Sequence, residues 1–360
     1  MERMQSTWEH RVRFDLSESG VRAISAAELF ADDRDALERA LREPLGYAQG
    51  NGHESLREAI ASFYPGAGAD DVCVTTGTSE ANFLALTALV EPGDRVVVVL
   101  PAYMQVHGWA TALGAEVTPL WLREERGWQF EEVELRRALH HAKLVYLCEP
   151  NNPTGAVLTA DVREALLDPV HESGAWLLAD QVYRGAEQRD ALTPSLFADD
   201  GVIVTAGLSK VFGLPGLRIG WVVTTQEMAA RIWSTHDYST IAPTTLSATF
   251  AERALRRREA LIARAREIVR AGWPVLADWS AAHDFAVVPP AAGAIAFLRR
   301  DLGMPSTEFV DRLIREESTM VVPGDHFLRE GYLRIGFGMP PDDLDAGLAR
   351  ISALLARVAV

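Results

Sequence analysis

Residues 207–221 read Gly-Leu-Ser-Lys-Val-Phe-Gly-Leu-Pro-Gly-Leu-Arg-Ile-Gly-Trp, directly after the apolar, strand-like run 202–206. Lys210 in this stretch is one of only two lysines in the chain, and the other is Lys143. Arginine keeps its proton in proteins, whereas a lysine whose pKa is lowered can act as an amine nucleophile. The stretch therefore predicts a reactive lysine, followed eight residues later by the cation Arg218. A solvated loop lysine is the alternative.

Two ionisable residues stand in apolar, strand-like runs. Asp180 ends the run 175–180, and Arg334 stands alone in the run 331–336. Burying either charge is costly unless a partner is present. We interpret both residues as ligand-binding groups. The alternatives are a helix cap by Asp180 and a structural salt bridge at Arg334.

The segment 71–90 predicts a strand, a turn and a helix. The strand is expected at 71–76, the turn at 77–81, and the helix continues to Val90. A helix N-terminus offers free N–H groups and a positive dipole end, so a phosphate fits there beside Thr78 and Ser79. A plain cap by Ser79 is the alternative, and the two are compatible.

The lysine stretch and the turn Asn151-Asn-Pro-Thr-Gly155 together resemble the class I/II aminotransferases, which are fold-type-I enzymes that use pyridoxal phosphate. The resemblance runs from about Leu45 to Gly336. It implies an α/β fold, with a mostly parallel seven-stranded sheet between helices in a large domain, plus a smaller α+β domain. The implied divisions are an N-terminal arm (1–22), a small domain (23–44 and 251–360) and a large cofactor-binding domain (45–250).

The resemblance also assigns roles to individual residues. Lys210 would form a Schiff base with the cofactor, Asp180 would keep the pyridine nitrogen protonated, and Arg334 would bind the substrate carboxylate. One position departs from the family: Gly207 stands where a phosphate-binding serine is usual, so that hydrogen bond comes from elsewhere or is absent. Tyr183 is a further catalytic candidate. The other implied cofactor ligands are Gly77, Thr78, Ser79, Tyr103 (stacking on the ring), Asn152, Ser209, Arg218 and, from the neighbouring subunit, Tyr47; the implied substrate ligands besides Arg334 are Asn152, Ser17 and Ser19.

These roles are compatible with two reactions that share their first steps. An L-amino acid would join the cofactor as an external aldimine and lose its Cα proton to Lys210. Transamination is the expected reaction, and Cβ elimination, replacement or cyclisation is the alternative that uses the same residues. The segments 15–21 and 321–327 resemble a bacterial subgroup that includes capreomycidine synthase, whose elimination and ring closure on a hydroxyarginine serve antibiotic biosynthesis.

Composition narrows the class of partner. The formal net charge of −15 argues against nucleic acids and anionic membrane surfaces. No apolar run approaches the roughly 20 residues that span a bilayer. Cys73 and Cys148 lie in apolar runs and are expected to be buried thiols in a reducing cytoplasm. No metal-ligand spacing is present. The expected partners are amino acids, 2-oxo acids and a second copy of the chain, which would share its active site through Tyr47 and the loop 237–244.

A cofactor-binding regulator without catalytic activity is a remote alternative. Such regulators carry an additional helix-turn-helix domain, and the residues before Tyr47 leave little room for one. The acidic balance also disfavours DNA.

Periodicity predicts the remaining elements. We expect a helix at 26–41, one or two helices at 244–279, a helix starting at Ser306 as its cap, and an irregular segment at 8–20.

Overall fold

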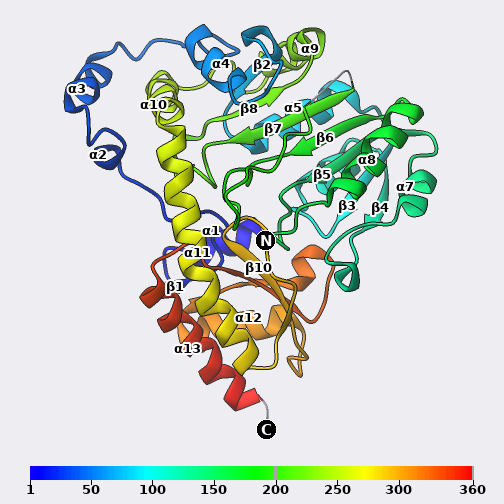
Figure 1. The fold of residues 1–360 in the computed structure, drawn as a ribbon, viewed down its shortest axis with the longest axis vertical. Coiled ribbons are helices and arrows are strands. Elements are labelled where there is room, and N and C mark those ends of the chain that lie inside the picture. Colours follow the sequence, from blue (N-terminus) through cyan, green and yellow to red (C-terminus); the bar gives the residue numbers. More distant parts are fainter. Residues whose placement is uncertain (198–200, 359–360) are drawn as a thin grey trace.

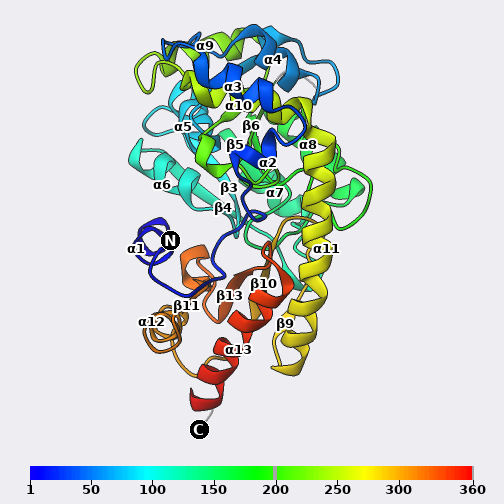
Figure 2. The same cartoon turned by 90° about the vertical axis from the view of Figure 1, so that its left-hand side faces the viewer.

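The computed structural model describes residues 1–197 and 201–358 of the chain. Figure 1 shows a large body with a central sheet and a smaller body below it, joined by the long helix α11 (Arg258–Ala282). The N-terminus lies between the two bodies, which is clearest in Figure 2.

The large body is built on a seven-stranded sheet with the order β2-β8-β7-β6-β5-β3-β4. β8 runs antiparallel to both of its neighbours, and the other neighbouring strands are parallel. This confirms the predicted mostly parallel α/β sheet. The strands are β2 (Val72–Thr75), β3 (Arg95–Leu100), β4 (Glu116–Trp121), β5 (Ala142–Cys148), β6 (Trp176–Asp180), β7 (Val202–Gly207) and β8 (Gly220–Val223).

Both faces of this sheet are buried, which explains its continuous apolar strands. Along β3, Val97 and Val99 belong to one core cluster, and Val96 and Val98 belong to the other. Successive strand residues point to opposite faces, so each face has its own core. The helices that contribute to the first cluster include α4 (Glu54–Ala61), α7 (Glu132–Ala138) and α8 (Ala160–Ser173). Those of the second are α5 (Thr78–Leu89), α6 (Gln105–Ala112) and α9 (Gln226–His236).

The smaller body contains a four-stranded antiparallel sheet with the order β12-β13-β10-β9. Its strands are β9 (Ala286–Val287), β10 (Ile295–Arg299), β12 (Val322–Pro323) and β13 (Tyr332–Gly336). The helices α12 (Ser306–Glu317) and α13 (Pro341–Val358) pack against each other and beside α11. A short parallel pair, β1 (Phe14–Asp15) with β11 (Thr319–Met320), attaches the N-terminal segment to this body.

The segment 26–41 contains two helices where one was expected. These are α2 (Ala26–Leu29) and α3 (Arg34–Arg42). The Asp33 carboxylate accepts a hydrogen bond from the Ala36 N–H at 2.8 Å and caps α3. A local cap therefore starts a new helix within the apolar periodicity. α3 contacts α10 (Thr245–Arg256), and α10 and α11 are the two helices of the segment 244–279.

The first residues form a helix that the sequence did not predict, α1 (Glu2–Trp8). The segment after it is largely irregular, as expected, apart from β1. Four 3₁₀ turns complete the description: η1 (Ala69–Asp71), η2 (Glu124–Arg126), η3 (Pro215–Leu217) and η4 (Gly324–Phe327).

Within residues 1–197 and 201–358, no helix combines the length and the apolar character needed to cross a membrane. The same residues contain no cluster of histidine, cysteine and carboxylate side chains arranged to hold a metal ion.

Candidate active site

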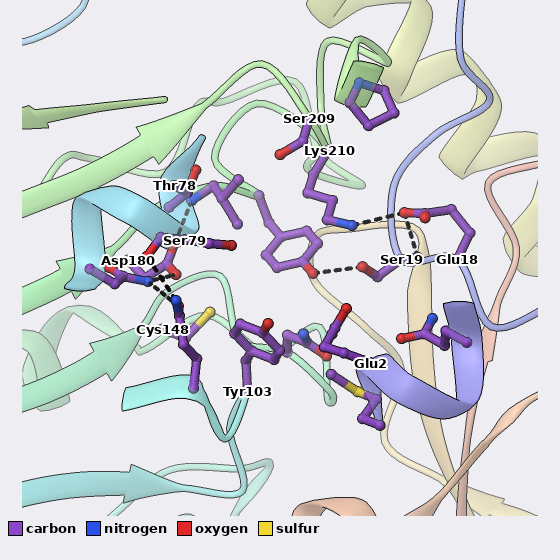
Figure 3. Close-up of a pocket in the computed structure, with 18 of the residues that line it drawn as sticks. Glu2, Glu18, Ser19, Thr78, Ser79, Tyr103, Cys148, Asp180, Ser209 and Lys210 are labelled. Atoms are coloured by element: carbon purple, nitrogen blue, oxygen red, sulfur yellow. Dashed lines mark hydrogen bonds and ion pairs between the residues drawn. The ribbon is translucent and has the colours of Figure 1, made fainter. Parts of the chain in front are cut away.

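A cavity of about 310 Å³ lies outside the carboxyl ends of the central strands, where the large body faces the small one (Figure 3). β5 ends at Cys148 and β6 at Asp180, and Lys210 follows β7. Open α/β sheets bind ligands at this edge. The predicted site residues that line the cavity are Ser19, Thr78, Ser79, Tyr103, Asn152, Asp180, Tyr183, Ser209, Lys210, Arg218 and Arg334.

Asp180 supplies a fixed carboxylate in the cavity wall. It is only 4% exposed, and it accepts hydrogen bonds from Asn82 Nδ2 (3.0 Å) and the Val182 N–H (3.1 Å). The Thr205 hydroxyl orients Asn82 by donating to its Oδ1 at 2.7 Å. Burial raises the pKa of the Asp180 carboxyl to about 6, against the lowering effect of these hydrogen bonds. A cationic ligand atom beside Asp180 would favour its ionised form.

The Lys210 side chain projects into the cavity, where it meets the N-terminal arm (Figure 3). Its Nζ lies 2.9 Å from Glu18 Oε1. The same oxygen accepts hydrogen bonds from the N–H groups of Ser19 (2.9 Å) and Gly20 (2.7 Å). Burial raises the pKa of the Glu18 carboxyl, but the charge and hydrogen bond of Lys210, together with the Gly20 N–H and the charge of Arg334, lower it to about 2.

The N-terminus of α5 opens onto the cavity beside Gly207. The helix begins at Thr78, and no side chain caps it, so the alternative cap by Ser79 is wrong. The Thr78 hydroxyl is buried and has no hydrogen-bond partner within the described part of the chain. Free N–H groups and an unpartnered hydroxyl together suit an anion such as phosphate.

Arg218 adds positive charge to this end of the cavity. Its guanidinium packs so closely against Gly77 that a Cβ atom there would collide with it, and Gly77 has a φ of 84°. Arg218 NH1 also donates to the Pro215 carbonyl at 3.1 Å. Gly77 thus shapes the cavity wall from behind Arg218 and does not line it.

Arg334 is a buried guanidinium without a carboxylate partner among the described residues. It is 1% exposed, and it donates to Asn152 Oδ1 (2.9 Å) and to the Ser17 carbonyl (2.5 Å), while its Nε has no partner within the described chain. Burial lowers its pKa. Such a group favours an anionic ligand that can take two parallel hydrogen bonds. Ser17 therefore lies behind Arg334 and outside the cavity.

Two tyrosines contribute hydroxyl groups to the walls. The Tyr183 hydroxyl donates to Ser19 Oγ at 2.9 Å, and Tyr103 lies across the cavity (Figure 3). Burial raises the pKa of both hydroxyls, so both stay protonated at neutral pH.

Three predicted site residues do not line the cavity of their own chain, namely Ser17, Gly77 and Tyr47, and several cavity residues were missed. Tyr47 is 91% exposed. Glu18 and Asn82 were not anticipated, nor were Glu2, Gln5 and Glu9 on and after α1. A carboxylate flanked by two serines in the arm was the available signal for Glu18.

The family model for aminotransferases of class I and II matches residues 16–351 of the chain. The chain belongs to this family. It is 36% identical over 349 residues to capreomycidine synthase of Streptomyces vinaceus, with 95% of this chain and 90% of that protein covered. It is 26% identical to the aspartate/prephenate aminotransferase of Thermus thermophilus, with 93% and 91% covered.

Solved structures of the family share the whole fold. A pyridoxal-phosphate-dependent aminotransferase from Streptococcus suis matches with a TM-score of 0.94 at 29% identity, covering 99% of this chain and 97% of that one. The pyridoxal-phosphate-dependent cyclase OrfR matches with a TM-score of 0.91 at 31% identity, covering 99% and 96%. The protein is thus an enzyme of the aminotransferase fold that depends on pyridoxal phosphate.

The cavity fits this cofactor chemically. The unpartnered Thr78 hydroxyl and the N-terminus of α5 suit its phosphate, and the buried Asp180 carboxylate suits its ring nitrogen. Lys210 offers the amine that its aldehyde requires.

Proposed function

We propose that the protein removes the Cα proton of an L-amino acid and transfers its amino group, as an aminotransferase. The observation that carries this proposal is that Lys210 and Arg334, which has no carboxylate partner among the described residues, line one cavity together with the buried Asp180. When bound, pyridoxal phosphate supplies an electron-poor ring that takes up the electron pair left at Cα. The chain's own residues bind the cofactor, orient the substrate and move the proton.

The cofactor ligands follow from the walls of the cavity. Thr78, Ser79, Ser209 and Arg218 would bind the phosphate, with the α5 N-terminus behind them. Asp180 would pair with the ring nitrogen. On the remaining wall, Tyr103 would stack on the ring, and Asn152 and Tyr183 would donate hydrogen bonds to the phenolic oxygen.

The substrate would be oriented by its α-carboxylate. Arg334 is rigid, because β13 carries it and Asn152 and the Ser17 carbonyl fix its fork. A carboxylate bound to this fork would sit in the cavity with Lys210. The Lys210 amine would accept the Cα proton and, in transamination, deliver it to the cofactor carbon that carried the aldehyde.

Elimination or replacement at Cβ, with ring closure, is the second candidate function. The acidic wall favours it: Glu2, Glu9 and Glu18 line the cavity and would attract a substrate with a cationic side chain. The likeness to capreomycidine synthase and to the cyclase OrfR supports the same branch.

Incubation with ¹⁵N-labelled amino acids and 2-oxo acids separates the candidates. Transfer of ¹⁵N to a 2-oxo acid, with conversion of the cofactor to its amino form, supports transamination. Loss of a Cβ group without transfer of nitrogen supports elimination. Tight cofactor binding without turnover of any amino acid would support the regulator alternative and contradict both.

We also propose a homodimer with shared active sites. Several of the exposed large apolar side chains lie in two segments, 45–47 and 238–241: Leu45 (80%), Tyr47 (91%), Tyr238 (92%) and Ile241 (52%). The two segments that carry them are in contact, because Thr245 Oγ1 donates to the Gly46 carbonyl and Gly50 packs against Ile241. A patch of this kind on one surface is typical of a protein interface.

Glu80 ties this patch to the phosphate end of the cavity. It accepts hydrogen bonds from Ser239 Oγ (2.7 Å) and Thr240 Oγ1 (2.8 Å), and it lies in the first turn of α5. The loop 237–244 is therefore held beside the helix that opens onto the cavity.

The buried free thiols of Cys73 and Cys148 support a reducing, cytoplasmic location.

A further inference from the structure

We propose that Glu18 is the counter-ion of the proton that Lys210 carries, both on its free amine and on the same nitrogen when it is joined to the cofactor. This inference rests on the proposed function, because it takes Lys210 as the residue linked to the cofactor. It adds a positioning residue that the aminotransferase motifs of the sequence do not include.

The contact between the two side chains is direct and lies at the cavity wall, where the Glu18 side chain is about half exposed. Lys210 Nζ is 2.9 Å from Glu18 Oε1, and both residues line the wall (Figure 3). Oε1 also receives the N–H groups of Ser19 and Gly20. The carboxylate is thereby fixed by its own backbone, so Lys210 does not have to order it.

Backbone contacts fix the distance between the two residues. The Val21 N–H donates to the Lys210 carbonyl at 3.1 Å, and a Cβ atom at Gly20 would lie 3.2 Å from Lys210 Cα. On its other side, the arm is bound to β13 and its continuation: the Gly336 N–H donates to the Leu16 carbonyl at 2.7 Å. The arm thus presents Glu18 to Lys210 as a preorganised group.

Other charged and titratable groups lie around the pair, including Glu2 and Glu9 on and after α1 and Arg218 after η3, which line the same cavity. Asp15 comes from β1, Asp180 from β6, Tyr183 from the segment after β6, and Arg334 from β13. Arg334 is the competing cation for Glu18. A substrate carboxylate on Arg334 would neutralise it, which leaves Lys210 as the main cationic partner of Glu18 when the site is filled.

A carboxylate at this distance favours the form of the nitrogen that carries a proton. Once Lys210 has accepted the Cα proton, the ammonium group is stabilised by Glu18. The ammonium group would then hold the proton in the cavity until it is passed to the cofactor carbon in transamination or to the leaving group in elimination. The same stabilisation serves transamination and elimination.

The test is a pH titration of the cofactor absorbance in the full-length, cofactor-loaded protein, because this absorbance reports whether the linking nitrogen carries a proton. Glu18→Gln keeps the shape of the side chain and removes its charge. It should lower the midpoint by about 1 to 3 pH units, the usual effect of one adjacent opposite charge. Glu9→Gln is the matched control, since Glu9 lines the cavity but its carboxylate lies 3.4 Å from the His10 ring and makes no ion pair with Lys210. The midpoint of this variant should stay near that of the wild type.

If Glu18→Gln does not fold, Glu18→Asp provides the test. It keeps the charge but shortens the side chain, so its midpoint should lie below the wild-type value by a smaller amount. An unchanged midpoint in a folded Glu18→Gln protein, or a raised midpoint in Glu18→Asp, overturns the proposal. Turnover with an unmoved midpoint overturns only the role of Glu18. A shifted midpoint without turnover of any amino acid supports that role and contradicts the proposed function, and the absence of any titratable cofactor band contradicts both.

Discussion

The Thr78 hydroxyl lies in the space that a side chain at Gly207 would need. A Cβ atom at Gly207 would be 2.6 Å from Thr78 Oγ1 and 2.9 Å from the Ile219 carbonyl oxygen. Across the β7–β8 pair, Gly207 faces Gly220, where a Cβ atom would collide with the Gly77–Thr78 peptide. Both glycines thus allow the start of α5 to approach the sheet. This geometry leaves no room for a side chain at position 207.

We predict that Thr78 and position 207 act non-additively in cofactor retention. Thr78→Ala removes the hydroxyl that we expect to donate a hydrogen bond to the charged phosphate. It should weaken cofactor binding by about 10- to 100-fold. Gly207→Ser should also weaken it, because the new side chain meets Thr78. The double variant should bind the cofactor more tightly than the sum of the two single losses predicts. Removing the Thr78 hydroxyl leaves space for the new serine side chain at position 207. Titration of cofactor binding by absorbance measures this, and simple additivity would refute it.

The second prediction concerns Asp180 and pH. Burial raises the pKa of this carboxyl to about 6 from its ordinary 3.8. The folded, cofactor-free protein therefore binds a proton at Asp180 more readily than the unfolded chain. The stabilisation that this proton adds to the unfolding free energy is fully present below about pH 4 and is lost as the pH rises through 6. Relative to wild type, Asp180→Asn should gain about 2 to 3 kcal/mol of unfolding free energy between pH 4 and pH 7.

Denaturant unfolding at a series of pH values checks this difference. Adding pyridoxal phosphate should remove it, because a cationic ring nitrogen would lower the pKa of Asp180. A difference between wild type and variant that does not change with pH would show that Asp180 does not titrate in this range.

The sheet could be predicted from the sequence because its strands are continuous apolar runs bounded by polar residues. Asp180 and Arg334 stood out for the same reason, as single charges in apolar surroundings. α1 gave no such signal, because none of its residues is fully buried. It is joined to the arm by polar contacts, in which Gln5 Nε2 donates to the Ser17 carbonyl (3.1 Å) and hydroxyl (3.0 Å).

Contacts between residues far apart in the chain could not be predicted, because no local sequence pattern marks them. Glu18 and Lys210 are 192 residues apart, and no local pattern connects them. Ser306 was expected to cap α12, yet Pro305 precedes the helix. The Glu330 carboxylate accepts hydrogen bonds from the Ser306 N–H (2.6 Å) and hydroxyl (3.1 Å). The cap thus comes from a distant acid, which periodicity cannot reveal.

The third prediction tests the substrate carboxylate site. Arg334→Lys keeps a positive charge but loses the planar fork that can donate two parallel hydrogen bonds. It should lower kcat/KM by about 10-fold or more, mainly through KM, because at least one charged hydrogen bond is lost. The control is Arg299→Lys, a half-exposed arginine on the neighbouring strand that pairs with Glu124. Equal effects of the two substitutions would contradict the assignment.

The fourth prediction concerns the dimer. Tyr47 is exposed on its own chain, and we expect its hydroxyl to reach the cofactor phosphate of the partner subunit. Tyr47→Phe should weaken cofactor retention by about 1 to 3 kcal/mol. A Lys210→Ala chain mixed with a Tyr47→Ala chain should regain one working site, because one site then carries both intact residues. A mixed dimer that stays inactive, or an active monomer by ultracentrifugation, would contradict the shared site.

The central claim is that Lys210 joins the cofactor, and the chain allows a direct measurement because Lys143 is its only other lysine. Lys143 lies exposed on β5, outside the cavity, and serves as the internal control. The loaded protein is reduced with borohydride, digested and analysed by mass spectrometry. We expect a pyridoxyl adduct on the peptide that contains Lys210 and none on that of Lys143, and Lys210→Ala should abolish the adduct. An adduct at Lys143, or one that persists in Lys210→Ala, would contradict the claim.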